Sequence, residues 1–525
     1  MRHQLAKVKN PVLRGFNPDP SICVANGTVY VATSTFEWFP GVQIHASRDL
    51  RAWELAARPL NEARLLDMRG VPDSCGVWAP CLSYSDGRFW LCYTRVSRFD
   101  GNFKDTPNYL TWAHDIAGPW SDPVFLNASG FDPSLFHDDD GRKWFLNMVW
   151  DHRDGHDRFG GIVLQEYDPG LQRLVGRPTT IYRGSGCGGT EGPHLYKRDG
   201  WYYLFVAEGG TGYGHAVTVA RSRTIGGPYE TDPAGFLLTA RGAPGHPLQR
   251  VGHGSLAELP DGRLFLAFLC SRKGQSPMGR ETGLQEIVYR DGWFRTPSGS
   301  VLPDETVFEG ERAAAESRIH YRFTPGPLAE DFQWLRSPEP GRLFTLAARP
   351  GYLRLFGRQS IGALFEQALV ARRQTEPVFS AEVVMDYAPD DFQQMAGLVA
   401  YYNSRKFHYL YVSHDDVLGR YAGVMVCRAD ETQAVEFLGE RVRLPQGEIR
   451  LHLVCDGNRQ QFFVAAGTGP WKAVGPALEA ATLSDDAGRD VDASFTGTFV
   501  GVCAQDLTGR KVPADFRDFV YSEKP

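Results

Sequence analysis

A short phrase recurs five times in the first half of the chain: an apolar strand runs into Asn-Gly or Asp-Gly, and an aromatic-rich strand follows. The turn glycines stand about sixty residues apart, at Gly27, Gly87, Gly141, Gly200 and Gly262. Asn-Gly and Asp-Gly between apolar runs are the strongest short hairpin signal, because tight hairpin turns need positive φ. One such hairpin per period is typical of the blades of a β-propeller.

Just upstream of each turn glycine stands a residue whose side chain we expect at the propeller axis. Eight or nine residues before the glycines are Asp19, Trp78, Asp132, Glu191 and His253. Because equivalent positions on radially repeated blades converge on one axis, these side chains should surround one cavity. The sequence therefore predicts a site that contains three carboxylates, a Trp and a His.

The chain is long enough for two large domains, since it has 525 residues. Residues 1–310 carry the repeat, and the stretch EGERAAAESRIHYRFTPG then breaks the period. We interpret 311–326 as a linker. From residue 327 to residue 525, long alternating strands occur without the repeat, which is typical of an antiparallel β-sandwich.

Composition excludes several classes of partner. The net charge is −6 and no basic run occurs, so nucleic acid is not expected as a partner. The N-terminal stretch has no apolar core of signal-peptide length, and no apolar run reaches the roughly 20 residues of a membrane span. Nine cysteines without CxxC pairs favour buried, reduced thiols over disulfides or metal ligands. We therefore expect a cytoplasmic protein that does not bind membranes.

The three carboxylates indicate catalysis when they are taken together. Alone, Asp19 in FNPDPS is explained as well by a turn beside proline. Three carboxylates in one bore would repel one another unless the site used their charge or their proton. Two carboxyl groups across a small cavity are the machinery of glycoside hydrolysis, and a third nearby would raise the pKa of the acid. The alternative from another class is a carbohydrate-binding propeller without turnover.

Further residues at the same blade end suit a sugar ligand. Phe36 and Trp38 in STFEWFPG, with Trp78 in GVWAP, could stack on apolar sugar faces, although each could equally be a core residue. Arg280 in MGRET is the best candidate cation for holding a hydroxyl or a carboxylate, with a surface ion pair to the next residue as the alternative. His253 in VGHGS could orient a carboxylate, hold a cation through water, or simply be hydrogen-bonded.

Several of these phrases together resemble the two-domain β-xylosidases of glycoside hydrolase family 43. The matching stretches are FNPDPSIC, STFEWFPGVQIHASRDL, PDSCGVWAPCLSYSDGRFWL, SGFDPSLFHDDDGRKW, TEGPHLY, AEGGT, MGRET and ARPGYLRLFGRQS. The resemblance implies an all-β fold, a five-bladed β-propeller followed by a jelly-roll-like C-terminal β-sandwich that contributes to the pocket.

The resemblance also implies a role for each site residue. Asp19 would be the general base, Glu191 the general acid, and Asp132 the residue that orients the acid and modulates its pKa. Arg280 would bind substrate, and Phe495 in SFTGTF would reach the pocket from the second domain.

The implied reaction is removal of terminal β-D-xylosyl units from xylo-oligosaccharides or aryl xylosides, with inversion. No cofactor would be required. Whether a divalent cation such as Ca²⁺ binds near the axis, at His253, is left open, and so is whether the protein forms a homo-oligomer (dimer or tetramer). Within the same chemistry the alternative is α-L-arabinofuranosidase or dual activity. A retaining, fructosyl-transferring propeller is a third reading that GVWAP and TEGPHLY fit less well.

Overall fold

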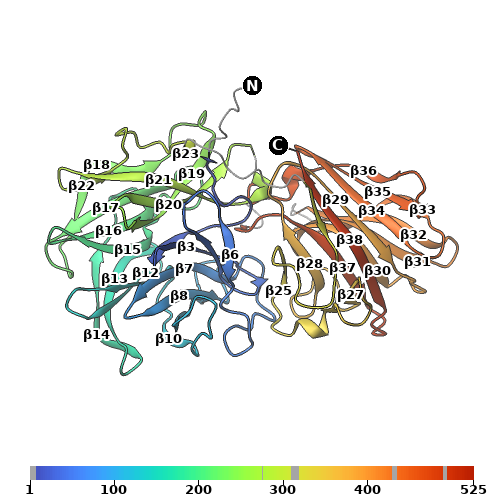
Figure 1. Cartoon of the computed structure of the whole chain (residues 1–525), viewed down its shortest axis with the longest axis horizontal. Helices are drawn as coiled ribbons and strands as arrows, with labels where there is room; N and C mark the ends of the chain where they lie inside the picture. The colour runs from blue at the N-terminus through green and yellow to red at the C-terminus, as the bar shows by residue number, and fades with distance from the viewer. Residues whose placement is uncertain (1–7, 275, 309–317, 429–433, 489–492, 525) are drawn as a thin grey trace.

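Two β domains lie side by side in the computed structural model, which describes residues 8–274, 276–308, 318–428, 434–488 and 493–524. The N-terminal domain is blue to green in Figure 1, and the C-terminal domain is yellow to red. Within the described residues the helices are three short 3₁₀ turns, η1 (Ser276–Met278), η2 (Pro340–Arg342) and η3 (Ala480–Thr482).

The N-terminal domain is a five-bladed β-propeller, and each blade is a four-stranded antiparallel sheet. The first blade contains β2 (Ser21–Ala25), β3 (Thr28–Thr33), β5 (Gln43–Ser47) and β6 (Glu54–Ala57). The second contains β7 (Gly76–Ser85), β8 (Arg88–Val96), β9 (Asn108–Ala113) and β10 (Val124–Asn127). The third contains β11 (Ser134–His137), β12 (Lys143–Trp150), β13 (Phe159–Asp168) and β14 (Arg173–Tyr182). The fourth contains β15 (Glu191–Arg198), β16 (Trp201–Glu208), β17 (Ala216–Ser222) and β18 (Glu230–Thr239). The fifth contains β19 (Leu248–Glu258), β20 (Leu264–Arg272), β21 (Glu281–Arg290) and β22 (Trp293–Arg295).

The predicted hairpins join the first two strands of every blade, which confirms the repeat. Blades one, two and four turn through two residues; in the first, Asn26 and Gly27 have φ values of 51° and 75°. Both central residues are left-handed, as the favoured two-residue hairpin turn requires. A Cβ on Gly27 would meet nothing within 4 Å, so this glycine serves backbone conformation and not close packing.

The ring closes where the first blade meets the fifth. The first strands of successive blades are neighbours, and β19 neighbours β2. Before β2, the backbone N–H groups of Val12 and Leu13 both donate to the Thr282 carbonyl, at 2.9 and 3.1 Å. At the edge of the domain, β1 (Val8–Lys9) pairs with β23 (Thr306–Phe308). The segment that leads to Asp19 is therefore held against the fifth blade.

The C-terminal domain is a β-sandwich of two eight-stranded sheets. One sheet contains β24 (Arg318–Tyr321), β26 (Phe344–Thr345), β27 (Leu353–Phe356), β29 (Val378–Asp386), β34 (Ile449–Asp456), β35 (Arg459–Ala466), β36 (Lys472–Glu479) and β38 (Pro513–Glu523). The other contains β4 (Trp38–Phe39), β25 (Phe332–Leu335), β28 (Ala368–Arg373), β30 (Gln394–Asn403), β31 (Lys406–Asp415), β32 (Gly419–Arg428), β33 (Val435–Arg443) and β37 (Phe499–Asp506). Burial alternates along β29, as expected for a strand with one face on the core.

The second sheet also packs against the propeller. Strands β30 and β37 are buried along their whole length, so both of their faces are covered. A hydrophobic cluster joins Phe16 and Phe36 of the propeller to Tyr401 and Phe499 of the sandwich. Strand β4, which the first half of the chain supplies, extends this sheet by pairing with β25. The two domains therefore share one continuous apolar interface.

The boundary between the domains differs from the predicted linker 311–326. Residues 309–317 lie outside the described part of the chain. Within the remainder of that interval, β24 pairs with β38 over four residues and belongs to the sandwich. The second domain therefore begins by Arg318, before the expected start at residue 327. The prediction missed this strand because it is only four residues long and gives a weak sequence pattern.

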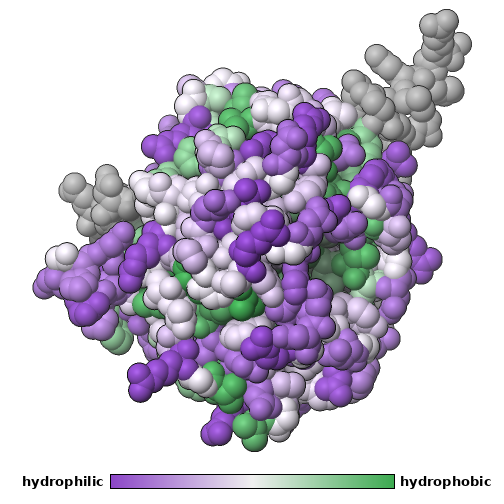
Figure 2. Space-filling model, turned by 90° about the vertical axis from the view of Figure 1, so that its left-hand side faces the viewer, coloured by the Kyte–Doolittle hydropathy of each residue, from purple (hydrophilic) through white to green (hydrophobic). Residues whose placement is uncertain are grey.

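The surface of the propeller end is mostly hydrophilic, with hydrophobic residues in small separate groups (Figure 2). In the described chain, no helix has the length and the apolar character needed to cross a membrane. None of the nine cysteines forms a disulfide, and eight of them are buried.

Candidate active site

A cavity of about 330 Å³ lies where the first strands of the blades begin, and the sandwich contributes Phe495 to its wall. This volume is at the lower end of the range for small-molecule sites, about 300–1,000 Å³. The residues that line it are Asp19, Phe36, Trp78, Phe99, Lys104, Phe131, Asp132, Trp150, Phe159, Glu191, Gly210, Thr211, His215, His253, Arg280 and Phe495. All the predicted site residues except Trp38 are among them.

Each first strand bends sharply where it enters this cavity. The bend is one residue with positive φ at the same position in every blade: Asp19 (55°), Ala79 (32°), Asp132 (57°), Gly192 (56°) and His253 (48°). Left-handed backbone is uncommon for residues other than glycine and often marks functional strain. Because Ala79 has no polar group to offer, the bend is a feature of the blade and not of the chemistry. In blades two and four the residue before the bend, Trp78 or Glu191, lines the cavity.

The predicted equivalence of five residues is therefore wrong at two of them. Trp78 and Glu191 each precede the bend residue by one position. The hairpin loops explain the error. In blades three and five, three residues lie between the last hydrogen-bonded pair, Asp138 with Arg142 and Leu259 with Arg263, whereas two residues lie there in the other blades. Counting back from the turn glycine thus missed the register by one residue in some blades, although all five side chains still reach the cavity.

Asp19 is held by two hydrogen bonds from opposite sides. Arg280 Nη1 donates to its Oδ1 at 2.7 Å, and Ser34 Oγ donates to its Oδ2 at 2.7 Å. The Asp19 side chain is buried and forms an ion pair with Arg280. Arg280 Nε is buried and has no hydrogen-bond partner among the described residues. A carboxylate fixed in this way can act as a base.

Glu191 is the carboxyl group whose environment favours the protonated form. Burial, and then the negative charge of Asp19, raise the pKa of its carboxyl group to about 8; Arg280 and Lys104 offset part of this rise. At neutral pH the group is therefore mostly protonated and can donate a proton. Two neighbouring carboxyl groups with separated pKa values are the arrangement that acid–base catalysis requires.

Asp132 positions the backbone beside the acid. Its Oδ2 accepts a hydrogen bond from the Gly192 N–H at 3.0 Å, directly after Glu191. Burial and the charges of Glu191 and Asp19 raise the pKa of Asp132 well above its ordinary value. We had expected the charge of Asp132 to raise the pKa of Glu191, but burial and Asp19 are the main causes. A carboxyl group whose own pKa is raised carries little charge while its neighbour titrates.

The other walls of the cavity are aromatic. The Trp78 ring lies 5.7 Å from Phe36 and 6.0 Å from Phe495, centroid to centroid, and its Nε1 donates to the Ser74 carbonyl. Phe495 comes from the sandwich, and its carbonyl accepts from Arg280 Nη2 at 3.1 Å. Rings around a polar centre suit a ligand with apolar faces and hydroxyl edges.

The prediction that Trp38 contacts the sugar is wrong, because this residue does not line the cavity. Its side chain is fully buried and stacks on Phe499 at 3.7 Å between ring centroids, with Tyr401 at its edge. Phe36, two residues earlier, has a φ of 52° and faces the cavity instead. Trp38 therefore anchors the sandwich to the propeller.

His253 lines the cavity next to a second histidine that the sequence did not single out. Burial lowers the pKa of His253, and burial together with the neighbouring His253 lowers that of His215 to about 3. Both rings are therefore neutral. Among the described residues, no group of three or more His, Cys, Asp or Glu is placed to hold a metal ion. The residues present do not form a protein-built cation site, and a cation at His253 would have to complete its coordination with water.

Several functional residues were not recognised from the sequence. Lys104, whose Nζ lies 4.3 Å from the Trp150 ring centroid, comes from a loop without any local signal. Glu208, in the AEGGT phrase, is fully buried and accepts from the hydroxyls of Thr190 and Thr218 at 2.9 and 2.6 Å. It thereby fixes the residue before Glu191. A carboxylate within an apolar strand was the signal that could have identified Glu208.

Comparisons with known proteins cover both domains. The model of glycosyl hydrolases family 43 matches residues 8–294, and that of the beta xylosidase C-terminal concanavalin A-like domain matches residues 320–522. The chain is 50% identical to xylosidase/arabinosidase 43B of Humicola insolens, over 98% of both chains. It is 45% identical to a beta-xylosidase of Bacillus subtilis (strain 168), covering 99% of this chain and 100% of that one. The crystal structure of a xylan beta-1,4-xylosidase from Bacillus halodurans C-125 superposes with a TM-score of 0.94, at 44% identity, over 98% of this chain and 100% of that one.

Proposed function

The chain belongs to glycosyl hydrolases family 43, and from this premise we propose that it is an exo-acting β-xylosidase. It removes terminal β-D-xylosyl units from the non-reducing end of xylo-oligosaccharides by an inverting, single-displacement mechanism. The observation that carries the proposal is that one small cavity holds both Asp19, fixed by Arg280, and Glu191, whose pKa is raised to about 8. The names of the relatives from Humicola insolens and Bacillus subtilis support the substrate class.

The proposed chemistry needs one water and one proton donor. Asp19 removes a proton from the water, whose oxygen attacks the anomeric carbon of the terminal sugar. Glu191 gives its proton to the glycosidic oxygen as the bond to the leaving group breaks. The oxygen of the water thus enters opposite the leaving group, and the configuration inverts. Each proton transfer contributes on the order of 10²–10⁴ in rate.

The remaining residues bind and orient. Arg280 keeps Asp19 in place and itself lines the cavity. Asp132 fixes the backbone beside Glu191 through the Gly192 N–H. Phe36, Trp78 and Phe495 supply the apolar walls. Because the sandwich closes one side of the cavity with Phe495, a single terminal unit fits better than the middle of a long chain.

The anomeric configuration of the first product tests the mechanism. A β-xyloside should release α-xylose first, observed by proton NMR before mutarotation equilibrates the anomers. Early accumulation of β-xylose would mean retention and would exclude the roles given to Asp19 and Glu191. In the same assay, dialysis against EDTA should leave kcat and KM unchanged, since every proton in the scheme has a protein donor or acceptor.

The second candidate is α-L-arabinofuranosidase activity, alone or beside xylosidase activity. The relative from Humicola insolens is named for both activities, and a 30% identical relative from Bacteroides ovatus is named an alpha-L-arabinofuranosidase. A panel of nitrophenyl glycosides separates the two through kcat/KM for each sugar. A carbohydrate-binding propeller without turnover is the remote alternative; three buried carboxylates argue against it, and any sugar release would exclude it.

Two further proposals come from the sequence. We propose that the protein assembles into a dimer or tetramer and acts in the cytoplasm on xylo-oligosaccharides. Light scattering after size exclusion tests the first proposal, and cell fractionation tests the second.

A further inference from the structure

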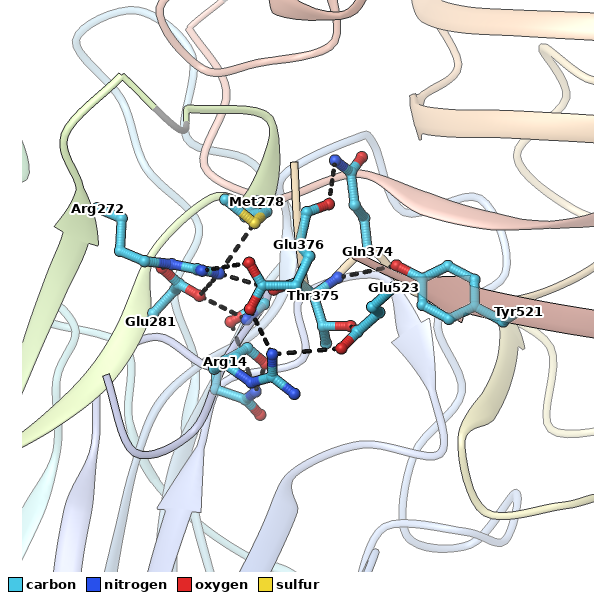
Figure 3. Close-up of polar contacts among 11 residues, drawn as sticks. Arg14, Arg272, Met278, Glu281, Gln374, Thr375, Glu376, Tyr521 and Glu523 are labelled. Atoms are coloured by element: carbon cyan, nitrogen blue, oxygen red, sulfur yellow. Dashed lines mark hydrogen bonds and ion pairs between the residues drawn. The ribbon is translucent and has the colours of Figure 1, made fainter. Parts of the chain in front are cut away.

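The interface between the two domains contains two groups of arginines: one group forms ion pairs with carboxylates, and the other does not. On one side, Arg14 and Arg272 of the propeller meet the carboxylates of Glu376 and Glu523 of the sandwich (Figure 3). Arg272 also donates to Glu281 from two nitrogens, both at 2.9 Å. These carboxylates raise the pKa of both guanidinium groups. Both arginines of this cluster are therefore paired with carboxylates.

A second cavity, of about 330 Å³, adjoins this cluster. It is distinct from the active site, because none of its lining residues lines the active-site cavity. The residues around it are Arg14, Asn17, Gln43, His45, Trp53, Glu54, Leu55, Arg58, Glu330, Asp331, Arg372, Arg373 and Thr375. Four arginines from three separate segments thus surround one space between the domains.

Three of these arginines have only neutral hydrogen-bond partners among the described residues. Arg58 donates to the Gln43 side-chain oxygen at 2.7 and 3.0 Å, and to backbone carbonyls. Arg373 donates to the Phe16 carbonyl at 2.6 Å and to Gln333 at 2.6 Å. Arg372 donates to the Tyr321 hydroxyl at 2.6 Å. None of the three forms an ion pair with a described carboxylate.

Unpartnered nitrogens remain on the same side chains. Arg372 Nε and Arg373 Nη2 have no hydrogen-bond partner, although these residues are only 5% and 6% exposed. His45 Nδ1 is also without a partner. Burial lowers the pKa of Arg58 to about 10, and burial and Arg58 lower that of Arg373 well below its ordinary value. Burying a cation without a counter-charge is costly, so this cavity lacks a negative charge.

The carboxylates at the cavity supply only part of that charge. Asp331 and Glu330 act to raise the pKa of Arg58, and Asp331 that of Arg373, but burial outweighs them. Glu54, Glu330 and Asp331 border it, but all three are exposed. The Asp331 carboxylate already accepts a hydrogen bond from the Tyr321 hydroxyl. Their contribution is therefore weakened by solvent, and the buried guanidinium groups keep their unpaired donors.

We propose that this interdomain cavity binds a small tetrahedral oxyanion of the phosphate type. Guanidinium groups match phosphate oxygens in geometry and charge, and donors from several segments suit an anion that accepts hydrogen bonds from all sides. The anion replaces the missing counter-charge of Arg58, Arg372 and Arg373.

Binding at this cavity is connected to the segment that carries Asp19. Arg373 holds the Phe16 carbonyl, and Gln43, which also accepts from Arg58, donates to Asn17 Oδ1 at 3.0 Å. Phe16 and Asn17 are the first two residues of the FNPDP phrase, which also contains Asp19. An anion here therefore stabilises the domain interface and the base-bearing segment together. The inference does not depend on the proposed glycosidase activity.

Phosphate titration of the full-length protein at constant ionic strength, balanced with chloride, tests the proposal. We expect saturable heat by isothermal titration calorimetry and a rise in melting temperature, with sulfate effective and acetate much weaker. Arg58→Gln keeps a hydrogen-bonding side chain and should weaken phosphate binding about tenfold or more, because a charge-assisted hydrogen bond is lost. Arg58→Lys should retain most of the affinity. The matched control, Arg263→Gln, removes an exposed arginine paired with Asp261 and should bind as the wild type does.

Three outcomes would overturn the proposal. The first is no saturable phosphate binding to the wild type. The second is equal binding by wild type and Arg58→Gln, with Arg373→Met as a second variant if circular dichroism shows that it folds. The third is competitive inhibition of glycoside hydrolysis with a constant equal to the calorimetric one, because phosphate would then occupy the active site at Arg280.

Discussion

The contact between the two domains should position the catalytic base, and Gly497→Ala tests this directly. The sandwich segment that carries Phe495 lies against the propeller segment that carries Arg280. A Cβ on Gly497 would stand 2.8 Å from the Met278 carbonyl oxygen, whereas ordinary contacts begin at 3.4 Å. One of the two segments must therefore move by about half an ångström.

A movement of this size is enough to break a hydrogen bond. Arg280 Nη2 lies 3.1 Å from the Phe495 carbonyl, and another half ångström takes the pair beyond hydrogen-bond distance. A hydrogen bond to a charged group is worth about 1.5–3 kcal/mol. If that loss appears in the transition state, because Arg280 orients Asp19, kcat/KM falls about tenfold to a hundredfold.

The assay is kcat/KM on an aryl xyloside, with the melting temperature measured in parallel. Gly439→Ala is the matched control, since it lies in the same domain, has no positive φ, and its Cβ would meet nothing within 4 Å. The reasoning is refuted if Gly497→Ala keeps wild-type kcat/KM, or if both variants lose activity equally. A lower melting temperature with unchanged kcat/KM would mean that the contact serves stability alone.

Three further predictions concern the acid, the base and the second domain. Glu191→Gln should lose most activity on xylobiose but recover with aryl leaving groups that need no proton, whereas Asp19→Asn should not recover; equal recovery of both would exclude the assigned roles. Because the protonated form of Glu191 is the active one, kcat/KM should fall as pH rises through about 8. Phe495→Ala exposes the cavity and should move this alkaline limb of the pH profile to lower pH. If the limb does not move, burial by the sandwich does not raise the pKa of Glu191. Removing the second domain from Arg318 onward should abolish activity even in any soluble product, and a fully active propeller would contradict a shared pocket.

Much of the fold followed from local patterns. Asn-Gly and Asp-Gly fix hairpins through backbone conformation, which only the residues at the turn decide, so the five hairpins were predictable. The register was not, because a hairpin loop of three residues instead of two shifts every count by one. Glu191 and Trp78 were assigned to the bend position for this reason, although Gly192 and Ala79 occupy it.

Site residues that were misplaced or missed depend on contacts between segments that are distant in sequence. Phe36 and Trp38 belong to one short apolar phrase, yet one lines the cavity and the other stacks on Phe499 of the sandwich. Nothing in the phrase reveals where the second domain packs. Lys104 is similar, since its loop reaches the cavity only through the packing of the second blade.

The positive φ of Ala79 shows which feature of the site comes from the propeller fold and not from catalysis. Four of the five bend residues carry a side chain despite positive φ, and one of these, Ala79, has no polar atom to contribute. The left-handed residue therefore belongs to the way a blade enters the centre, and no catalytic role is needed to explain it. Catalysis depends instead on burial: it is the first cause of the raised pKa of Glu191, and the aromatic walls and Phe495 provide that burial. We therefore expect the second domain to help keep the acid protonated, because a less buried carboxyl group has a lower pKa.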